Sequence, residues 1–350
     1  MNKKVRLGYA CINNTLAARP NKLGGRILTG RGVRKQSWFP TNDLKKLSDI
    51  AILNAKDLLH ILKWNEENNI RLFRIGSELI PWADHYELHE LPGYDEISKL
   101  LFECGEFARA HGHRLTTHPG PFHILGGSRE DVVNKSITSL ERHSEMFDMM
   151  GFAPSYENKI NIHIGGVYGD PEGTAYTWMK NWERLSNRCK ARLVVENDDK
   201  PSMYSVSMLY SFIHQNIGIP ITFDYFHHSL HPGSLSEQEA FEMARSTWPT
   251  GITQCCHYSE SRRTEYQLML EKVSSQHNIP LTELLEWPTF AQYKKDFDKI
   301  RITAHADYII HPINTYGYEV DIMIEAKAKE LALLQWRNIY NYNNQQKVLI

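Results

Sequence analysis

The chain has 350 residues, of which 41% are hydrophobic and 23% charged, and its formal net charge is −1. This composition is ordinary for a soluble globular protein, and the near-neutral total requires that any basic surface for nucleic acid be local. No stretch approaches the about 20 apolar residues that a membrane-spanning helix needs, and no signal-peptide pattern is visible. The five cysteines are odd in number and show no CxxC spacing, which favours free thiols in a reducing, cytoplasmic environment over a disulfide framework.

Eight short apolar runs are expected to form strands. Most of them lack a regular polar alternation, which is typical of parallel strands that are buried on both faces. In chain order they span 5–11, 70–76, 113–119, 159–166, 191–197, 219–225, 251–259 and 321–327.

Helical patterns separate these runs, with apolar residues at helical spacing and polar start signals. They cover 43–68, 94–111, 129–151, 175–189, 202–216, 236–247 and 328–341. Strand–helix alternation repeated eight times predicts a single (β/α)8 barrel over 1–342, followed by a frayed tail at 343–350. An open doubly wound sheet is the main alternative, but no glycine-rich phosphate-binding turn follows the first strand.

Two long connections interrupt the alternation. Residues 12–42 follow the first strand, and residues 260–320, with a helix expected over 281–300, follow the seventh. Loops of this length are usually functional or disordered.

Residues that can bind a metal stand at or near the ends of most of the later runs. The carboxyl ends of barrel strands meet at one mouth, where barrel enzymes keep their chemistry. A gathering of His, Asp and Glu there predicts a multi-metal hydrolytic site. The candidate ligands are His118, His163, Glu196, Asp224, His227, His257, His305 and Glu325.

Each of these positions also has an ordinary explanation. A lone histidine at a strand end is more often structural, and Glu196 could instead form a buried salt bridge. His228 could take the place of His227. Cys255 shares a strand face with His257 and could lie near the metals, although a buried cysteine is more often a small hydrophobe.

The connection over 12–42 is basic and contains no acidic residue. Such a run is usually a solvated surface, but its expected place at the barrel mouth predicts contacts with DNA phosphates. Tyr9, Asn13 and Phe122 are candidates for contacts with bases, Lys327 is a candidate for a phosphate contact, and Trp38 is expected in the core. The basic residues are Arg19, Lys22, Arg26, Arg31, Arg34 and Lys35.

Nine motifs, in this order, make the chain resemble the UV-damage endonucleases. They are GYACIN (8–13), RLFRIGSELIP (71–81), HPG (118–120), NIHIGG (161–166), VVENDD (194–199), FDYFHHSLHPG (223–233), CHYSES (256–261), AHADYI (304–309) and DIMIEAKAKE (321–330). The resemblance implies a barrel similar to endonuclease IV with two or three divalent cations, commonly manganese, with magnesium or zinc as alternatives. It implies nicking of damaged double-stranded DNA immediately 5′ of UV photoproducts, which leaves 3′-hydroxyl and 5′-phosphate ends.

The resemblance also implies roles for individual residues. Three cation positions would be held in turn by His118 with His163, by Asp224 with His257 and Glu325, and by His227 with His305. Glu196 would bridge the first two. The residues expected to act in catalysis are Glu196, Asp224, Glu325 and Lys327, and those expected to probe the lesion are Tyr9, Asn13, Pro121 and Phe122.

Two positions depart from the family pattern. Pro121 stands where a glutamine is usual, which removes one polar side chain from lesion probing. Cys255 stands where some members carry a carboxylated lysine, and a thiolate ligand there would favour zinc over manganese.

Three other functions remain as alternatives at this point. They are an endonuclease IV-like enzyme for abasic sites, a metal-dependent sugar isomerase or epimerase, and a non-catalytic damage-binding protein. We expect the protein to work on DNA as a monomer, away from membranes and without an obligate protein partner.

Overall fold

The computed structural model describes residues 6–120 and 123–340. Within these ranges, eight parallel strands form a nearly closed barrel in the order β6-β5-β4-β3-β2-β1-β8-β7. A bridge between Asp224 and His257 links the end of the β6 segment to β7 and completes the ring. The strands are β1 (Leu7–Ala10), β2 (Leu72–Ile75), β3 (Arg114–Thr117), β4 (Ile160–His163), β5 (Leu193–Glu196), β6 (Ile221–Thr222), β7 (Cys255–Tyr258) and β8 (Asp321–Ile324). The barrel prediction is therefore confirmed.

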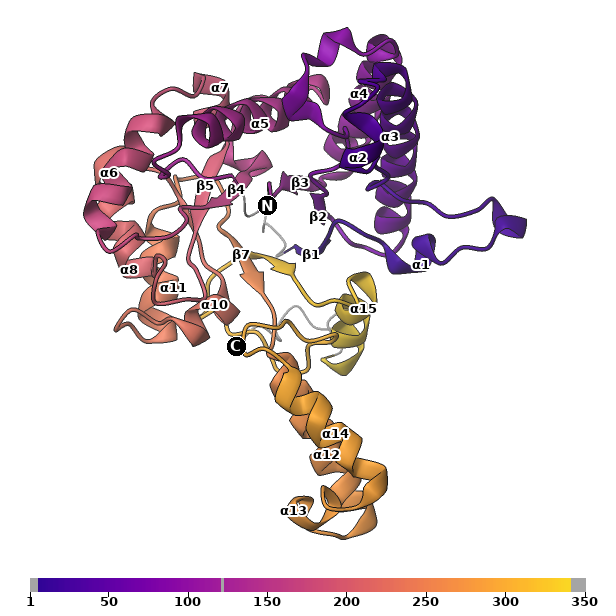
Figure 1. The fold of residues 1–350 in the computed structure, drawn as a ribbon, viewed down its shortest axis with the longest axis vertical. Coiled ribbons are helices and arrows are strands. Elements are labelled where there is room, and N and C mark those ends of the chain that lie inside the picture. The colour runs from indigo at the N-terminus through magenta and orange to yellow at the C-terminus, as the bar shows by residue number, and fades with distance from the viewer. Residues whose placement is uncertain (1–5, 121–122, 341–350) are drawn as a thin grey trace.

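The larger helices surround the strands, as Figure 1 shows. They are α3 (Leu44–Glu67), α4 (Tyr94–His111), α5 (Glu130–Met149), α6 (Pro171–Trp182), α11 (Glu237–Ser246) and α15 (Glu330–Ile339). Five of these agree with the predicted helices to within two residues at the ends that the structure describes. Two of the starts follow from capping: the Asp43 side chain accepts a hydrogen bond from the Lys46 backbone at the start of α3, and Ser236 forms a capping box with Glu239 at the start of α11.

Two predicted helices are divided differently in the structure. The helix expected over 175–189 is replaced by α6 and the short α7 (Asn187–Lys190), because Asp170 caps the chain earlier and Ser186 starts a new turn. The helix expected over 202–216 begins only after Ser205, which caps it. It then runs through α8 (Val206–Leu209), a π-helical turn (Tyr210–His214) and α9 (Gln215–Ile217).

The strand expected over 219–225 is much shorter than predicted. β6 ends at Thr222, and α10 (Tyr225–Leu230) begins three residues later. The Asp224 side chain causes this change, since it accepts a hydrogen bond from the His227 backbone and caps α10. A helix start at this point turns His227 back toward the barrel mouth.

The connection over 12–42 contains two short helices, α1 (Asn14–Ala17) and α2 (Lys35–Trp38). Trp38 is 4% exposed and stacks on Trp82 with ring centroids 5.8 Å apart, as its predicted core position requires.

The second long connection forms an arm that projects from the barrel (Figure 1). The arm consists of α12 (Arg262–His277), α13 (Leu281–Leu284) and α14 (Pro288–Lys299). The single helix expected over 281–300 is therefore two helices, and α12 was not predicted. Only Leu270 of α12 is buried among the described side chains, so the segment carries little of the apolar periodicity that marks a helix.

The amino-terminal end of the barrel is closed by a buried ion pair. The Arg114 side chain is fully buried, and its Nη1 donates to Asp321 Oδ2 at 2.8 Å. Its remaining donors reach the backbone oxygens of Thr253, Tyr156 and Glu157 at 2.8, 2.9 and 2.8 Å. The polar residues at the opposite end form the cluster described next.

Candidate metal centre

Glu196, at the end of β5, is the centre of the cluster at the carboxyl end of the barrel. It is 1% exposed, and its carboxylate meets side chains from several other strands. Oε2 lies 3.1 Å from His118 Nε2 and also accepts a hydrogen bond from Asn161 Nδ2. Oε1 lies 2.9 Å from His257 Nδ1. The register of the sheet also brings His163 next to Glu196, because the two residues are paired across β4 and β5.

Ligand atoms in this cluster gather into three overlapping groups, within each of which all atoms lie within 4.8 Å of one another. Mixed imidazole and carboxylate donors of this kind suit first-row divalent cations. The groups are His118 with Glu196 and His257, His163 with Glu196 and His227, and Asp224 with His257 and Glu325. Glu196 and His257 each belong to two groups, which makes both of them candidates to connect neighbouring cations.

The orientations of two histidine rings fit a ligand role. His118 Nδ1 lies 2.9 Å from the Pro119 carbonyl, which can only accept, so this nitrogen carries the proton. His163 Nδ1 lies 2.9 Å from the Asp198 carboxylate. In both residues Nε2 is the nitrogen that faces Glu196, at 3.1 and 3.9 Å. A hydrogen bond on the far nitrogen is the usual way in which proteins orient a metal-binding histidine.

Asp224 gives the clearest sign that the cluster is built for a cation. It is fully buried, and burial raises the pKa of its carboxyl to about 8. Within the described chain its Oδ2 has no hydrogen-bond partner, and an unsatisfied buried carboxylate oxygen is costly. A bound cation would remove that cost, so the residues present fit a divalent metal.

The other acidic ligands are held in their charged form by neighbouring basic side chains. Burial opposes ionisation of Glu325, but the guanidinium of Arg74, which forms an ion pair with it, and His257 together hold its pKa below the usual range. For Glu196, burial is likewise outweighed by His257 and His163, which lower its pKa. Burial also disfavours protonated His163, yet Asp198 and Glu196 outweigh it and raise the pKa of His163 to about 10.

Comparison with known proteins identifies the family. The profile of the UV-endonuclease UvdE family matches residues 5–349. The chain belongs to this family. It is 35% identical over 293 residues to a UV-damage endonuclease of Neurospora crassa, covering 73% of this chain and 44% of that protein. It is 30% identical over 337 residues to a UV DNA damage endonuclease of Clostridium perfringens, covering 95% of this chain and 70% of that protein.

A solved structure agrees with the sequence relatives. The crystal structure of SacUVDE superimposes with a TM-score of 0.74 and 26% identity, covering 97% of this chain and 99% of that one. The chain thus spans the full length of SacUVDE but less than half of the Neurospora protein. Family membership removes the sugar isomerase alternative. None of the helices in the described part of the chain is long and apolar enough to cross a membrane.

Seven of the eight predicted ligands fall into the three groups. The structure also decides between His227 and His228, which the sequence left open. His227 lies in a group with Glu196, whereas the His228 ring packs against Phe223 with centroids 5.4 Å apart. His305 belongs to none of the groups. Its ring lies 6.1 Å from that of His227 at the edge of the cluster, and its buried Nδ1 has no hydrogen-bond partner among the described residues.

The groups divide the ligands differently from the arrangement that the resemblance implied. His118 and His163 fall into separate groups, and His163 is combined with His227. Cys255 belongs to none of the groups and packs with apolar side chains such as Leu72 and Met323, as a small buried hydrophobe would.

Tyr9 and Asn13 are not placed to contact DNA, contrary to the prediction. Both are buried, at 0% and 1% exposure. Tyr9 Oη donates to Asn65 Oδ1 at 2.7 Å and accepts from Asn13 Nδ2 at 2.8 Å, while the Asn13 side chain caps α1. These residues stabilise the start of the 12–42 connection. Pro121 and Phe122, the other two predicted probing residues, lie outside the described residues.

The basic residues of the 12–42 connection are divided between two roles. Arg31 forms an ion pair with Asp57 at 2.6 Å and is half-buried, so it anchors the connection to α3. Arg19 is also partly buried. The exposed members are Lys22, Arg26, Arg34 and Lys35. Lys327, which follows β8, is exposed as well.

Four supporting residues were missed at the sequence level: Arg74, Lys159, Asn161 and Asp198. Lys159 Nζ is buried and lies 3.2 Å from His257 Nε2 and 3.0 Å from Asn161 Oδ1. The period of two along a strand places Lys159, Asn161 and His163 on one face. That alternation was the available signal, and the apolar residues between them obscured it.

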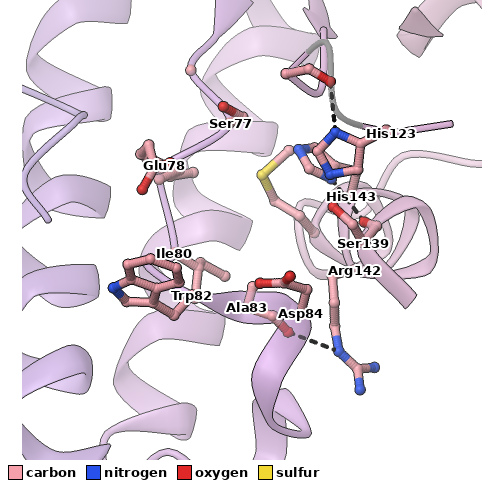
Figure 2. A pocket seen from close by; sticks show the side chains of 14 residues that line it. Ser77, Glu78, Ile80, Trp82, Ala83, Asp84, His123, Ser139, Arg142 and His143 are labelled. Carbon is pink, nitrogen blue, oxygen red and sulfur yellow. Dashed lines mark hydrogen bonds between the residues drawn. The ribbon is translucent and has the colours of Figure 1, made fainter. Parts of the chain in front are cut away.

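A pocket of about 330 Å³ lies beside the cluster, between the loop after β2, the loop after His118 and α5. Figure 2 shows His123 and His143 close together on one wall, with Trp82 and Asp84 among the other lining residues. His143 Nδ1 lies 2.8 Å from the Ser139 carbonyl, so its Nε2 carries a lone pair. Burial lowers the pKa of His143 to about 4, which keeps the ring neutral at physiological pH.

Proposed function

We propose that this protein is a metal-dependent endonuclease that nicks double-stranded DNA immediately 5′ of UV photoproducts and leaves 3′-hydroxyl and 5′-phosphate ends. The observation that carries the proposal is the set of three ligand groups around Glu196 at the barrel mouth, in a chain of the UvdE family. The relatives named as UV-damage endonucleases support the same activity.

The cluster would hold two or three divalent cations, with manganese expected and magnesium or zinc as alternatives. Bound cations supply Lewis acidity: they lower the pKa of a water molecule and neutralise charge on the phosphate and on the leaving oxygen. Each carboxylate oxygen of Glu196 faces a member of both groups to which it belongs: Oε2 lies near His118 and His163, and Oε1 lies near His257 and His227. Arg74 holds Glu325 ionised, and Asp198 orients His163.

Exposed basic residues would bind the DNA backbone on either side of the cut. Lys22, Arg26, Arg34 and Lys35 lie on the connection that leaves β1 at the mouth, and Lys327 follows Glu325 by two residues. Contacts of this kind position the duplex without reading its sequence. We propose that the protein acts on damaged DNA inside the cell as a monomer.

A nicking assay with manganese tests this function. It uses 5′-labelled duplexes that carry one cyclobutane pyrimidine dimer, one abasic site or no damage. Glu196→Gln is the test variant, and Glu106→Gln, an exposed residue on the outer face of α4, is the matched control.

We expect a cut 5′ of the dimer with wild-type protein and with Glu106→Gln, and no cut with Glu196→Gln. Cutting at the abasic site alone would reassign the protein as an endonuclease IV-like enzyme. Binding of damaged DNA without cutting of any duplex would favour the damage-binding alternative. A cut that Glu196→Gln retains would disprove the role of the cluster.

A further inference from the structure

Tyr168 has an unusual backbone on the rim of the barrel mouth. It lies in the turn after β4, between Gly165 and Asp170, and its φ is +47°. A left-handed φ is uncommon outside glycine and is an outlier for a bulky side chain. Two backbone hydrogen bonds fix the turn: Asp170 N donates to Val167 O at 2.8 Å, and Val167 N donates to Ser202 O at 2.9 Å.

The Tyr168 side chain is exposed even though the backbone that carries it is well fixed. It is 68% exposed. A Cβ at Gly166 would lie 3.6 Å from the ring atoms Cε1 and Cζ, so the ring folds back over Gly166. Among the described residues, the Tyr168 hydroxyl has no hydrogen-bond partner. Within residues 6–120 and 123–340, the contact with Gly166 is the one close approach noted for the ring, and it does not explain why an aromatic residue occupies a position that glycine would adopt without strain.

Tyr168 lies close enough to the cluster to reach DNA that is cut there. It follows the candidate ligand His163 by five residues, a stretch of chain that reaches at most about 18 Å. At 3.4 Å per base pair, this is about five base pairs of duplex. The turn lies between the loops after β3 and β5, because Gly165 approaches Ile124 and Val167 bonds to Ser202.

We propose that Tyr168 is a stacking platform for a nucleobase of the DNA near the cut, and this inference rests on the proposed function. An exposed ring on a fixed backbone offers an aromatic surface at low entropic cost, and bases stack on such rings irrespective of sequence. Lys200, on the loop that the Val167–Ser202 bond tethers, has a side chain 59% exposed and is suited to the adjoining phosphate. Backbone strain kept at a fixed, exposed aromatic residue is typical of a functional contact.

The test compares Tyr168→Gly and Tyr168→Phe with wild-type protein. Glycine at this position relieves the strain of the positive φ and removes the ring, whereas phenylalanine keeps the ring and loses only the hydroxyl. Tyr176→Ala is the matched control, because Tyr176 is also 68% exposed but lies in α6. Three quantities are measured: the Tm, the Kd for a duplex with one pyrimidine dimer, and the fluorescence of 2-aminopurine placed at successive positions flanking the dimer.

We expect Tyr168→Gly to keep or raise the Tm while Kd rises about 5- to 150-fold, the range for one lost base–aromatic stack. Quenching of 2-aminopurine at one position should be lost in this variant and kept in Tyr168→Phe. An unchanged Kd for Tyr168→Gly, with normal wild-type nicking, would overturn the stacking role alone. A fall in Tm that accounts for the lost binding would also overturn it. Wild-type protein that neither binds nor cuts damaged DNA would overturn the proposed function, and this inference with it.

Discussion

Manganese should stabilise the protein less after Glu196→Gln than after Glu325→Gln. Glu196 belongs to two of the three ligand groups and Glu325 to one. Removing the first carboxylate therefore leaves one complete group, and removing the second leaves two. Both substitutions keep the side-chain shape, so the comparison isolates the loss of a negatively charged ligand.

The expected size of the effect follows from chain length. A cation present at 100 times its Kd stabilises the folded state by about 2.7 kcal/mol. The entropy of unfolding near the midpoint, about 2.1 cal/mol/K per residue, gives about 0.7 kcal/mol/K for a chain of this length. Each bound ion should therefore raise the Tm by about 4 °C. We expect shifts of about 11 °C for wild-type protein with three ions, about 7 °C for Glu325→Gln and about 4 °C for Glu196→Gln, on the same scale.

Calorimetry of chelator-treated protein, repeated with increasing manganese, measures these shifts. Each variant is compared with its own metal-free form, because Glu325→Gln also leaves Arg74 without its partner and lowers the starting Tm. Glu106→Gln should behave as wild type. A shift for Glu196→Gln as large as that of wild-type protein, or larger than that of Glu325→Gln, would refute the grouping of ligands inferred here.

Three further predictions concern stability and DNA binding. Arg114→Met should lower the Tm by about 4–7 °C in calorimetry. The substitution removes a buried charged partner of Asp321 and lowers the free energy of unfolding by about 3–5 kcal/mol. An unchanged Tm would contradict this. Burial lowers the pKa of His143 to about 4, so the unfolded state binds more protons between pH 4 and 6.5, and the stability present above pH 6.5 is lost as the pH falls. His143→Phe should therefore lose less stability than wild-type protein as the pH falls from 6.5 to 4. In urea unfolding, the difference between the two decreases in the free energy of unfolding should reach up to about 3 kcal/mol. Replacing Lys22 and Arg34 by alanine should make the slope of log K for DNA association against log salt concentration shallower by about 2 if both residues contact phosphates. A slope equal to that of wild-type protein would show that the DNA does not contact these two residues.

The barrel, and the gathering of candidate ligands at its mouth, could be predicted from the sequence because both depend on local patterns. Buried parallel strands are continuous apolar runs, and a polar residue at the end of such a run is conspicuous. The barrel then brings those ends to one mouth. Which ligands share a cation could not be predicted in this way, because it depends on register and side-chain direction. The pairing of His163 with Glu196 across β4 and β5 is one example.

The incorrect predictions arose where something other than the apolar pattern decides the local structure. Tyr9 looks like an exposed aromatic residue at a strand end, but Asn65 of α3 provides its hydroxyl with a buried partner. The strand expected to continue to 225 ends early, because the Asp224 side chain caps a helix. α12 escaped prediction because most of it projects into solvent and needs no apolar face. The deciding partner is distant in sequence for Tyr9, a local helix cap for Asp224 and the solvent for α12.

Two groups of the cluster whose pKa values are raised show how closely its stability depends on cations. With pKa values of about 8 and 10, Asp224 and His163 both hold a proton at neutral pH in the absence of metal. A ligand must lose its proton before it binds, so cation binding at this site is coupled to proton release. The barrel therefore keeps buried carboxylates that are unfavourable alone and favourable once paired with cations. That balance explains why a fold with an apolar core tolerates such a polar cluster at one end.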